Sequence, residues 1–346
     1  MDLELLKDLC RIPGAPGFES GIRNYILKLV KSLTDELSVD ALGNIIAVKK
    51  GSGKSKLLFS AHMDEIGFIV QHIDDEGFIR FLPLGGFDPK TLSAQRVIIH
   101  GREDVLGVMG TKPIHLMTPE ERNKAPLIRD YFIDTGLSKD EVLKKINVGD
   151  PITRERDLIK MGKCINAKSL DNRISVYVLI ECLRRLKKQK HEADVYFVFT
   201  VQEEVGLRGA KTIVAQIQPE YSINIDTTIA FDVPGSQAHE VVTRLGQGVG
   251  IKIMDSMAIC DYRMTQFLKQ TADKSKIKWQ AELLPAGGTD TAAIQTGGKG
   301  CISGALSIPT RHIHQVIEMV NEDDVEAGIQ LCIKSIQSIQ KYDWKH

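Results

Sequence analysis

Two adjacent glutamates, Glu203 and Glu204, follow the segment DVYFVFTV, which ends at Val201. That segment is almost continuously apolar and rich in β-branched and aromatic residues, which is typical of a strand buried on both faces. Neighbouring side chains of a strand point to opposite faces, so both glutamates can serve one site only if the strand has already turned into a loop. Gly206 and Gly209 favour such a loop. The pair is therefore expected in the crevice at the carboxyl ends of the strands, the alternative being two ordinary acids on a solvated loop.

Further histidine and carboxylate side chains stand next to apolar segments. His62 and Asp64 follow KLLFSA, Asp226 follows YSINI, His314 follows GALSIPTRHI, and Asp171 opens a helix-like segment in SLDNR. Taken singly, an aspartate at a helix start fits an N-cap, and a histidine after a strand fits a hydrogen-bonded loop residue. Together with the glutamate pair, these residues predict a hydrolytic site for two divalent metal ions. Such a site needs a bridging carboxylate, imidazole and carboxylate ligands, and one unbound carboxylate as general base.

This interpretation gives each of the adjacent glutamates a use, because one can bind a metal ion while the other accepts a proton. It also gives a use to Asp64. In an extended His-x-Asp segment, the acid two residues on returns to the same face of the strand. Asp64 can then hold the outer ring nitrogen of His62 and fix the orientation of the ring.

The first elements expected along the chain, which help to position these residues, are helices. Apolar residues have helical spacing from Leu3 to about Leu37. The Pro/Gly-rich segment IPGAPGFES interrupts this spacing, so a second helix is expected to begin at Glu19 or Ser20. Short strands and hairpins follow, with turns at GSGK and DDEG.

The second half of the sequence alternates between strand and helix, which predicts a covered α/β sheet. A long amphipathic helix is expected from Arg173 to about Lys188, and EDDVEAGIQLCIKSIQSIQKY predicts a C-terminal helix. Residues 66–160 instead form short strand-like segments with one helix at SKDEVLKKI. The sequence therefore predicts one α/β domain from residues 1–65 and 161–346, with a small β-rich insert at 66–160. An insert of this size is expected to bury its own core poorly and to need a partner surface.

Composition narrows the classes of partner. The chain has 346 residues, 42% of them hydrophobic, with 45 basic and 45 acidic side chains. Balanced charge argues against nucleic acid and against a membrane surface, and favours small molecules or protein. The first residues, MDLELLKDLCRIPG, lack the pattern of a signal peptide, so a cytoplasmic location is expected. The six cysteines have no Cys-x-x-Cys spacing, which predicts neither a disulfide framework nor a zinc knuckle.

Five motifs in order give the chain a family resemblance. AHMDEIGF, KSLDNR, VQEEVGLRGA, NIDTT and IPTRHIHQ follow the order and approximate spacing of the tetrahedral (TET-type) dinuclear metallo-aminopeptidases. That family includes glutamyl aminopeptidases and proteins labelled endoglucanase or cellulase. The stretches PGAPGFE, GGFD, DTGLSKDE and GGTDTAAI also resemble it, so the resemblance spans nearly the whole chain. It implies a zinc-exopeptidase-like α/β fold, with a mixed central sheet covered by helices. It also implies that the β-rich insert mediates dimerisation, with dimers assembling into a dodecamer.

The resemblance also implies a set of functional residues and two divalent ions per subunit, with zinc or cobalt first and manganese as a further option. Asp171 would bridge the two ions. The other assignments are His62 and Asp226 on one ion, Glu204 and His314 on the other, Glu203 as general base and Asp64 behind His62.

Substrate-pocket candidates complete the prediction. Arg173 and the run GGTD fall near the family's site, which makes Gly288, Thr289 and Asp290 candidates alongside Arg173 and His312. N-capping of the following helix is an equally good explanation for Thr289 and Asp290.

Two positions depart from the family pattern, which usually has Tyr at the position of His312 and Ser at that of Gln315. These departures alter the pocket wall, and His312 could compete with His314 as a ligand. Residues two apart share a face of an extended segment, so alternation does not separate the two histidines. Only the resemblance favours His314.

The predicted function is that of a metal-dependent aminopeptidase acting on short peptides. An N-acyl-amino-acid deacylase or a carboxypeptidase would use the same two-metal site on a different end of the substrate. A glycoside hydrolase with Glu203 and Glu204 as its acid pair would need carboxyl groups about 5 Å or more apart across the scissile bond, and would not need the histidines. A metal-stabilised scaffold without catalysis is the alternative from another class, but it leaves Glu203 without a task.

Overall fold

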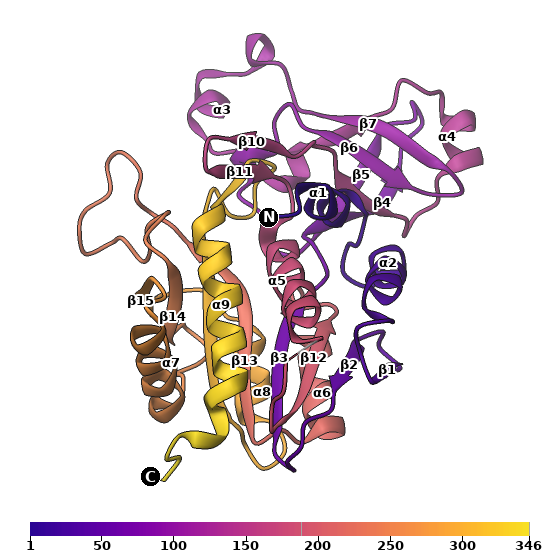
Figure 1. Cartoon of the computed structure of the whole chain (residues 1–346). Coiled ribbons are helices and arrows are strands. Elements are labelled where there is room, and N and C mark those ends of the chain that lie inside the picture. The colour runs from indigo at the N-terminus through magenta and orange to yellow at the C-terminus, as the bar shows by residue number, and fades with distance from the viewer. Residues whose placement is uncertain (188, 346) are drawn as a thin grey trace.

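The computed structural model describes residues 1–187 and 189–345, which form a helix-covered mixed sheet and a separate small β-barrel (Figure 1). Within these ranges the large sheet has eleven strands, in the order β1-β2-β12-β3-β13-β16-β17-β11-β10, with β14 joined to β16 and β15 to β14. Their bounds are β1 Glu36–Val39, β2 Ile45–Lys49, β3 Lys56–His62, β10 Ile159–Met161, β11 Cys164–Ala167, β12 Asp194–Thr200, β13 Tyr221–Ile229, β14 Val249–Met254, β15 Trp279–Leu283, β16 Ile302–Arg311 and β17 Glu318–Asn321.

The centre of this sheet is parallel. Strands β12, β3, β13 and β16 pair in parallel, whereas β1, β2, β17, β11 and β10 add antiparallel pairings toward the edges. Parallel strands buried on both faces need helices on both sides, and the sequence supplies them between the strands. The prediction of an α/β fold with a mixed, helix-covered sheet is therefore confirmed.

Alternating residues of the central strands pack against two helical layers. On β3, Leu57 and Phe59 belong to the core formed with α1, α2, α5, α7 and α9, whereas Leu58 packs with α6 and α8 on the other face. Figure 1 shows α5 and α9 lying across the central strands. The helices of these layers are α1 Leu3–Arg11, α2 Ser20–Val30, α5 Leu170–Leu186, α6 Arg208–Ile217, α7 Tyr262–Ser275, α8 Asp290–Thr296 and α9 Glu322–Ser338.

The helix bounds agree in part with the prediction. The second helix begins at Ser20 with Glu19 as N-cap, as predicted, but it ends at Val30 and not near Leu37. Helical spacing beyond Val30 was misleading, because residues 36–39 pair with β2 as an edge strand. The long helix ends at Leu186, and its predicted end at Lys188 lies outside the described residues. The C-terminal helix is present as α9, where the Asn321 side chain accepts a hydrogen bond from the amide of Asp323.

The small sheet closes into a barrel in the order β4-β5-β8-β7-β6-β9. Its strands are β4 Gly67–Ile73, β5 Ile79–Leu84, β6 Arg96–His100, β7 Asp104–Gly110, β8 Phe132–Asp134 and β9 Pro151–Arg154, with the short helices α3 Pro119–Asn123 and α4 Lys139–Lys145 in its connections. These strands fall inside the insert predicted at 66–160, and the boundaries of the insert stay a prediction. Strand β10, which overlaps the predicted end of the insert, pairs with β11 in the large sheet.

The barrel buries a core of its own, contrary to the expectation that so small an insert would do so poorly. Phe68, Val97, Ile99, Ile133 and Ile152 are each fully buried there. Closing the sheet allows every inward side chain to meet the others, which a small open sheet does not.

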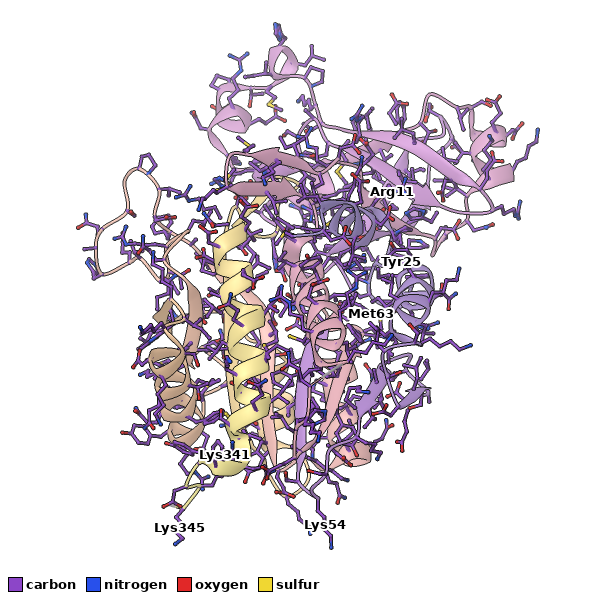
Figure 2. The ribbon with its side chains drawn as sticks, viewed as in Figure 1. Arg11, Tyr25, Lys54, Met63, Lys341 and Lys345 are labelled. Atoms are coloured by element: carbon purple, nitrogen blue, oxygen red, sulfur yellow. The ribbon has the colours of Figure 1, made fainter. Side chains whose placement is uncertain are left out.

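The carboxyl ends of the parallel strands face the barrel. Lys54, just before β3, projects at the end of the molecule farthest from the barrel, whereas Met63, just after β3, lies nearer to it (Figure 2). Side chains that follow the central strands therefore gather between the large sheet and the barrel. Within the described ranges, no helix is both long and apolar enough to cross a membrane.

Candidate active site

Side chains from separate elements converge at the carboxyl ends of the parallel strands. His62 is the last residue of β3 and pairs with Thr200, the last residue of β12. Asp226 lies on β13 beside Ser307 of β16. Because parallel strands end at one edge of the sheet, residues far apart in the sequence meet there.

The first group of possible metal ligands contains His62, Glu203 and Asp226. One ligand atom of each lies within 4.8 Å of the others. The Nε2 atom of His62 is 3.6 Å from an oxygen of Asp226. All three side chains line one cavity.

The second group contains His62, Asp171 and Glu204, whose ligand atoms also lie within 4.8 Å of one another. One oxygen of Asp171 is 3.3 Å from Nε2 of His62, and the other is 3.1 Å from Nε2 of His314. His314 Nε2 is also 3.6 Å from Glu204. The Asp171 carboxylate thus lies between two imidazoles, the arrangement that a bridging ligand requires.

The backbone at Asp171 is not that of a helix start. Asp171 and Asn172 have non-helical φ/ψ angles, and the peptide bond between them is cis. Continuous helical angles begin only after Asn172, and the Asp171 side chain faces the two histidines, with no capping hydrogen bond from it among the described residues. The Asp171 amide donates a 2.9 Å hydrogen bond to Glu318, which fixes this segment against β17.

The Asp64 side chain forms hydrogen bonds with the backbone of the glutamate pair. Its two carboxylate oxygens accept hydrogen bonds of 3.1 Å from the amides of Glu203 and Glu204. Positive φ angles at Gln202 and Gly206 turn the chain at this point. Asp64 also lies 3.4 Å from Nδ1 of His62, the ring nitrogen for which it was predicted. The amide contacts were not predicted, because HMDE and QEE give no sign that they meet.

Electrostatics of the cluster suit divalent cations. Burial raises the pKa of Glu204 to about 8, and burial raises the pKa of Glu203 well above its ordinary value. Burial opposes the charged form of His314, but the carboxylates of Glu204 and Asp171 raise its pKa to about 10. The Oε1 atom of Glu204 is buried without a hydrogen-bond partner in the described part of the chain. Crowded carboxylates, two imidazoles and an unpartnered oxygen are the donor set that two divalent ions fit.

The cluster forms one end of a cavity of about 450 Å³. Apolar side chains contribute much of the remaining wall: Leu207, Ile229, Met257, Leu284 and Ile313. Of the substrate-pocket candidates, Gly288 and Thr289 line this cavity. Asp290 lies behind the wall, where it accepts a 2.5 Å hydrogen bond from Thr200. Thr289 holds the N-cap position of α8 without a capping hydrogen bond, and its hydroxyl contacts Thr291 and Asp255 instead.

The remaining candidates lie away from the cavity wall. Arg173 is completely buried, and its guanidinium donates to the carbonyls of Leu9 and Ile12, which ties α1 to α5. His312 is exposed and does not line the cavity, whereas His314 does. Positive φ angles at both histidines end the extended geometry of β16, and this is why they do not share a face.

Glu318 belongs to the site but was not singled out in the sequence. Its oxygens accept hydrogen bonds from the amides of Asp171 and His314, each 2.9 Å long. It is almost fully buried on β17. A carboxylate inside the apolar run VIEMV was the available signal, since a buried acid needs partners.

Comparison with known proteins identifies the family. Residues 43–331 match the peptidase family model described as M42 glutamyl aminopeptidase. A lysyl aminopeptidase of Pyrococcus furiosus is 34% identical over 351 residues, covering 99% of this chain and 99% of that protein.

Solved structures agree with this match. The TET aminopeptidase of the marine sediment archaeon Thaumarchaeota archaeon SCGC AB-539-E09 is 36% identical with a TM-score of 0.94, over 97% of this chain and 95% of that one. The TET1 peptidase of Pyrococcus horikoshii, which can assemble into a tetrahedron or a large octahedral shell, is 33% identical with a TM-score of 0.87, over 96% and 98% of the two chains. The motifs, the fold and these similarities lead to one conclusion: this chain belongs to the M42 glutamyl aminopeptidase family.

Proposed function

We propose that the protein is a metal-dependent aminopeptidase that removes amino-terminal residues from short peptides at a pair of divalent ions. The observation that carries this proposal is the Asp171 carboxylate between His62 and His314, with one glutamate of the adjacent pair in each ligand group. His62 and Asp226 would hold one ion, Glu204 and His314 the other, and Asp171 both. Two bound ions would polarise the scissile carbonyl and acidify a water molecule. Zinc and cobalt suit this donor set best, and manganese is also compatible with it.

Glu203 is the proposed general base. Its carboxylate belongs to the first group of possible ligand atoms and lines the cavity, and burial raises its pKa well above the ordinary value for a glutamate. In the proposed reaction Glu203 accepts a proton from the attacking water and delivers it to the leaving amine. Asp64 fixes the backbone of Glu203, so that its carboxylate stays aligned with the scissile bond.

Cationic side chains are scarce among the described residues that line the cavity. Lys252 is the only lysine or arginine among the described residues that line the cavity, and it lies 2.7 Å from Glu282 and 3.4 Å from Asp255. A carboxypeptidase would need an available cation for the substrate carboxylate.

We further propose that the chain forms a homo-oligomer in which the barrel supplies the dimer contact. Leu82, Leu106 and Val108 are apolar residues of the barrel strands and are about half exposed. The TET1 peptidase of P. horikoshii, to which the chain is similar, can assemble into a tetrahedron or a large octahedral shell. Leu106→Lys should reduce the mass measured by light scattering, whereas Leu143→Lys, at a similarly exposed leucine on α4, should not. An unchanged mass for the first variant would reject this contact.

The test of the reaction uses one short peptide with a free or an acetylated amino terminus. Chelated protein is assayed before and after zinc or cobalt is returned, and release of the first residue is measured. Metal-dependent cleavage of the free peptide alone is the expected result. Cleavage of the acetylated peptide would instead indicate a deacylase or an endopeptidase, and no cleavage with two ions bound would indicate a non-catalytic protein.

A further inference from the structure

His314 has a backbone conformation that needs support. Its φ angle is +64°, in the left-handed region that residues with a side chain rarely adopt. A residue keeps such a conformation only when its surroundings impose it, and conformations of this kind concentrate at functional sites. What holds His314 therefore bears on how the site works.

Three hydrogen bonds hold this residue. Its amide donates to Glu318, at 2.9 Å, from within the large sheet. Its ring Nδ1 is 2.9 Å from the carbonyl oxygen of Gly86, and its own carbonyl accepts a 2.9 Å bond from Nη1 of Arg154. A carbonyl oxygen can only accept, so Nδ1 carries a proton and Nε2 is the nitrogen left to face Asp171. Gly86 follows β5 and Arg154 ends β9, so both of these contacts come from the barrel side.

Arg154 is an unusual residue for its position. It is only 2% exposed, and its guanidinium lies 5.3 Å from the ring centroid of Phe87. Its Nε and Nη2 atoms have no hydrogen-bond partner among residues 1–187 and 189–345. Burying a guanidinium with unsatisfied donors is unfavourable. The single hydrogen bond that it does make, to the His314 carbonyl, gives a reason for an arginine here.

We propose that Arg154 is a positioning residue of the active site, through which the barrel holds His314 in the orientation needed to bind a metal ion. The proposal rests on the proposed function in one respect, the role of His314 as a ligand. It assigns the barrel a part in building the site, in addition to any part in assembly. Loss of Arg154 should then affect the ion held by His314 and Glu204 much more than the ion held by His62 and Asp226.

Arg80, which is exposed where Arg154 is buried, offers a control for loss of an arginine from the same barrel. Its Nη1 donates a 3.0 Å hydrogen bond to the carbonyl of Tyr131, and its guanidinium lies 5.8 Å from the ring centroid of Phe132. These are the same two kinds of contact that Arg154 makes, but both partners belong to the barrel. Arg80→Met therefore tests damage to the barrel without touching His314.

The experiment compares the full-length wild type with Arg154→Met, Arg154→Lys and Arg80→Met. Each chelated protein is titrated with cobalt(II) in competition with a chelator, and its visible absorption spectrum is recorded. We expect Arg154→Met to weaken one of the two affinities by about 10–100-fold and to change the cobalt spectrum, because residues that orient a ligand have effects of this size. Arg154→Lys, which keeps one donor, should recover part of the loss. Arg80→Met should keep both affinities within about twofold of wild type.

Kinetics add a second measurement. With both sites saturated, kcat of Arg154→Met should fall while KM changes by less than about twofold, because the substrate wall is intact. Two wild-type affinities and an unchanged spectrum in folded Arg154→Met would overturn the proposal, as would equal losses in Arg80→Met. If Arg154→Met shows no cooperative thermal transition, Arg154→Lys is measured in its place, and an equal loss of both metal affinities in that variant would overturn the proposal. The titration needs no catalysis, so a wild type that binds two ions without cleaving peptides would reject only the proposed function.

Discussion

One carboxylate oxygen of Asp64 accepts a 3.1 Å hydrogen bond from the amide of Glu203. The other oxygen accepts a hydrogen bond of the same length from the amide of Glu204, so a single buried side chain holds the backbone of both glutamates. An aspartate can accept from two amides at once, whereas an asparagine offers only one acceptor oxygen. The two proposed roles of the glutamate pair thus depend on one carboxylate.

Asp64→Asn should lower kcat by about 10–100-fold, because one of the two amides loses its acceptor and the loop shifts. Steady-state assays on metal-saturated protein measure this effect. Asp35→Asn, at a half-exposed acid near β1, is the control and should keep its activity. Wild-type kcat in Asp64→Asn would show that the amide contacts do not position the glutamates.

Glu203→Gln should reduce kcat by about 10²–10⁴-fold, the usual contribution of a general base. Metal content, measured by elemental analysis, should stay at the wild-type level. Glu204→Gln is the informative comparison, since it should lose metal from the ion shared with His314. Near-normal activity of Glu203→Gln would refute its role as base.

Gly209→Ala should destabilise the protein and the site loop. A Cβ atom there would fall 2.3 Å from Oδ1 of Asn44 and 2.6 Å from the carbonyl oxygen of Val201. Asn44 accepts a hydrogen bond from the Val201 amide, so the clash would disturb the strand end that carries the glutamates. Overpacking of this kind costs about 1–3 kcal/mol in the free energy of unfolding.

Urea unfolding measures that loss. Gly21→Ala on α2 is the control, because its Cβ would meet its nearest neighbours at 3.6 Å. It should be neutral or stabilise by about 0.4–1 kcal/mol. Equal stability of the two variants would contradict the clash.

Stability should depend on pH through Asp324, a buried residue in the first turn of α9. Burial raises the pKa of Asp324 to about 6, although the amides of Gly246 and Gly248 donate to it. The folded state therefore keeps this proton to a higher pH than the unfolded state, whose aspartates titrate near about 4. The contribution of Asp324 to stability falls as pH rises from about 4 to about 6.

Asp324→Asn removes this titration, so the difference in unfolding free energy between variant and wild type should change with pH across that window. Urea unfolding at several pH values gives the difference directly. A constant difference from about pH 4 to about pH 7 would contradict the raised pKa.

Chelation of the metal ions should lower the thermal midpoint at a fixed protein concentration. Without cations the buried carboxylates repel one another, and the folded state loses the binding free energy of the ions. For a single site this contribution is about 2.7 kcal/mol at a ligand concentration 100 times Kd. Return of zinc or cobalt should restore the midpoint, and an unchanged midpoint in metal-free protein would argue against ions at this cluster.

Local sequence patterns predicted much of the fold and of the candidate site. Almost continuous apolar runs located β3, β12 and β13, and parallel strands bring His62 and Asp226 to one edge of the sheet. Contacts between segments that are distant in the sequence leave no local sequence pattern. Three features depend on where distant segments meet. They are the hydrogen bonds from two amides to Asp64, the buried position of Arg173, and the hydrogen bond from Arg154 of the barrel to the His314 carbonyl. The choice between His312 and His314 depends on positive φ angles that alternation does not reveal.

The adjacency of Glu203 and Glu204 has a consequence for how this site can change over evolution. Although they are neighbours in the chain, each lies in a different group of ligand atoms. The proposed role of each glutamate therefore depends on its position in the loop, and the two positions are one residue apart. Substitution of one of the two glutamates can abolish the role of that residue alone. Loss or gain of a single residue between Val201 and Glu203 would move both carboxylates by one position in the same direction, and would disrupt both roles although no strand residue is removed.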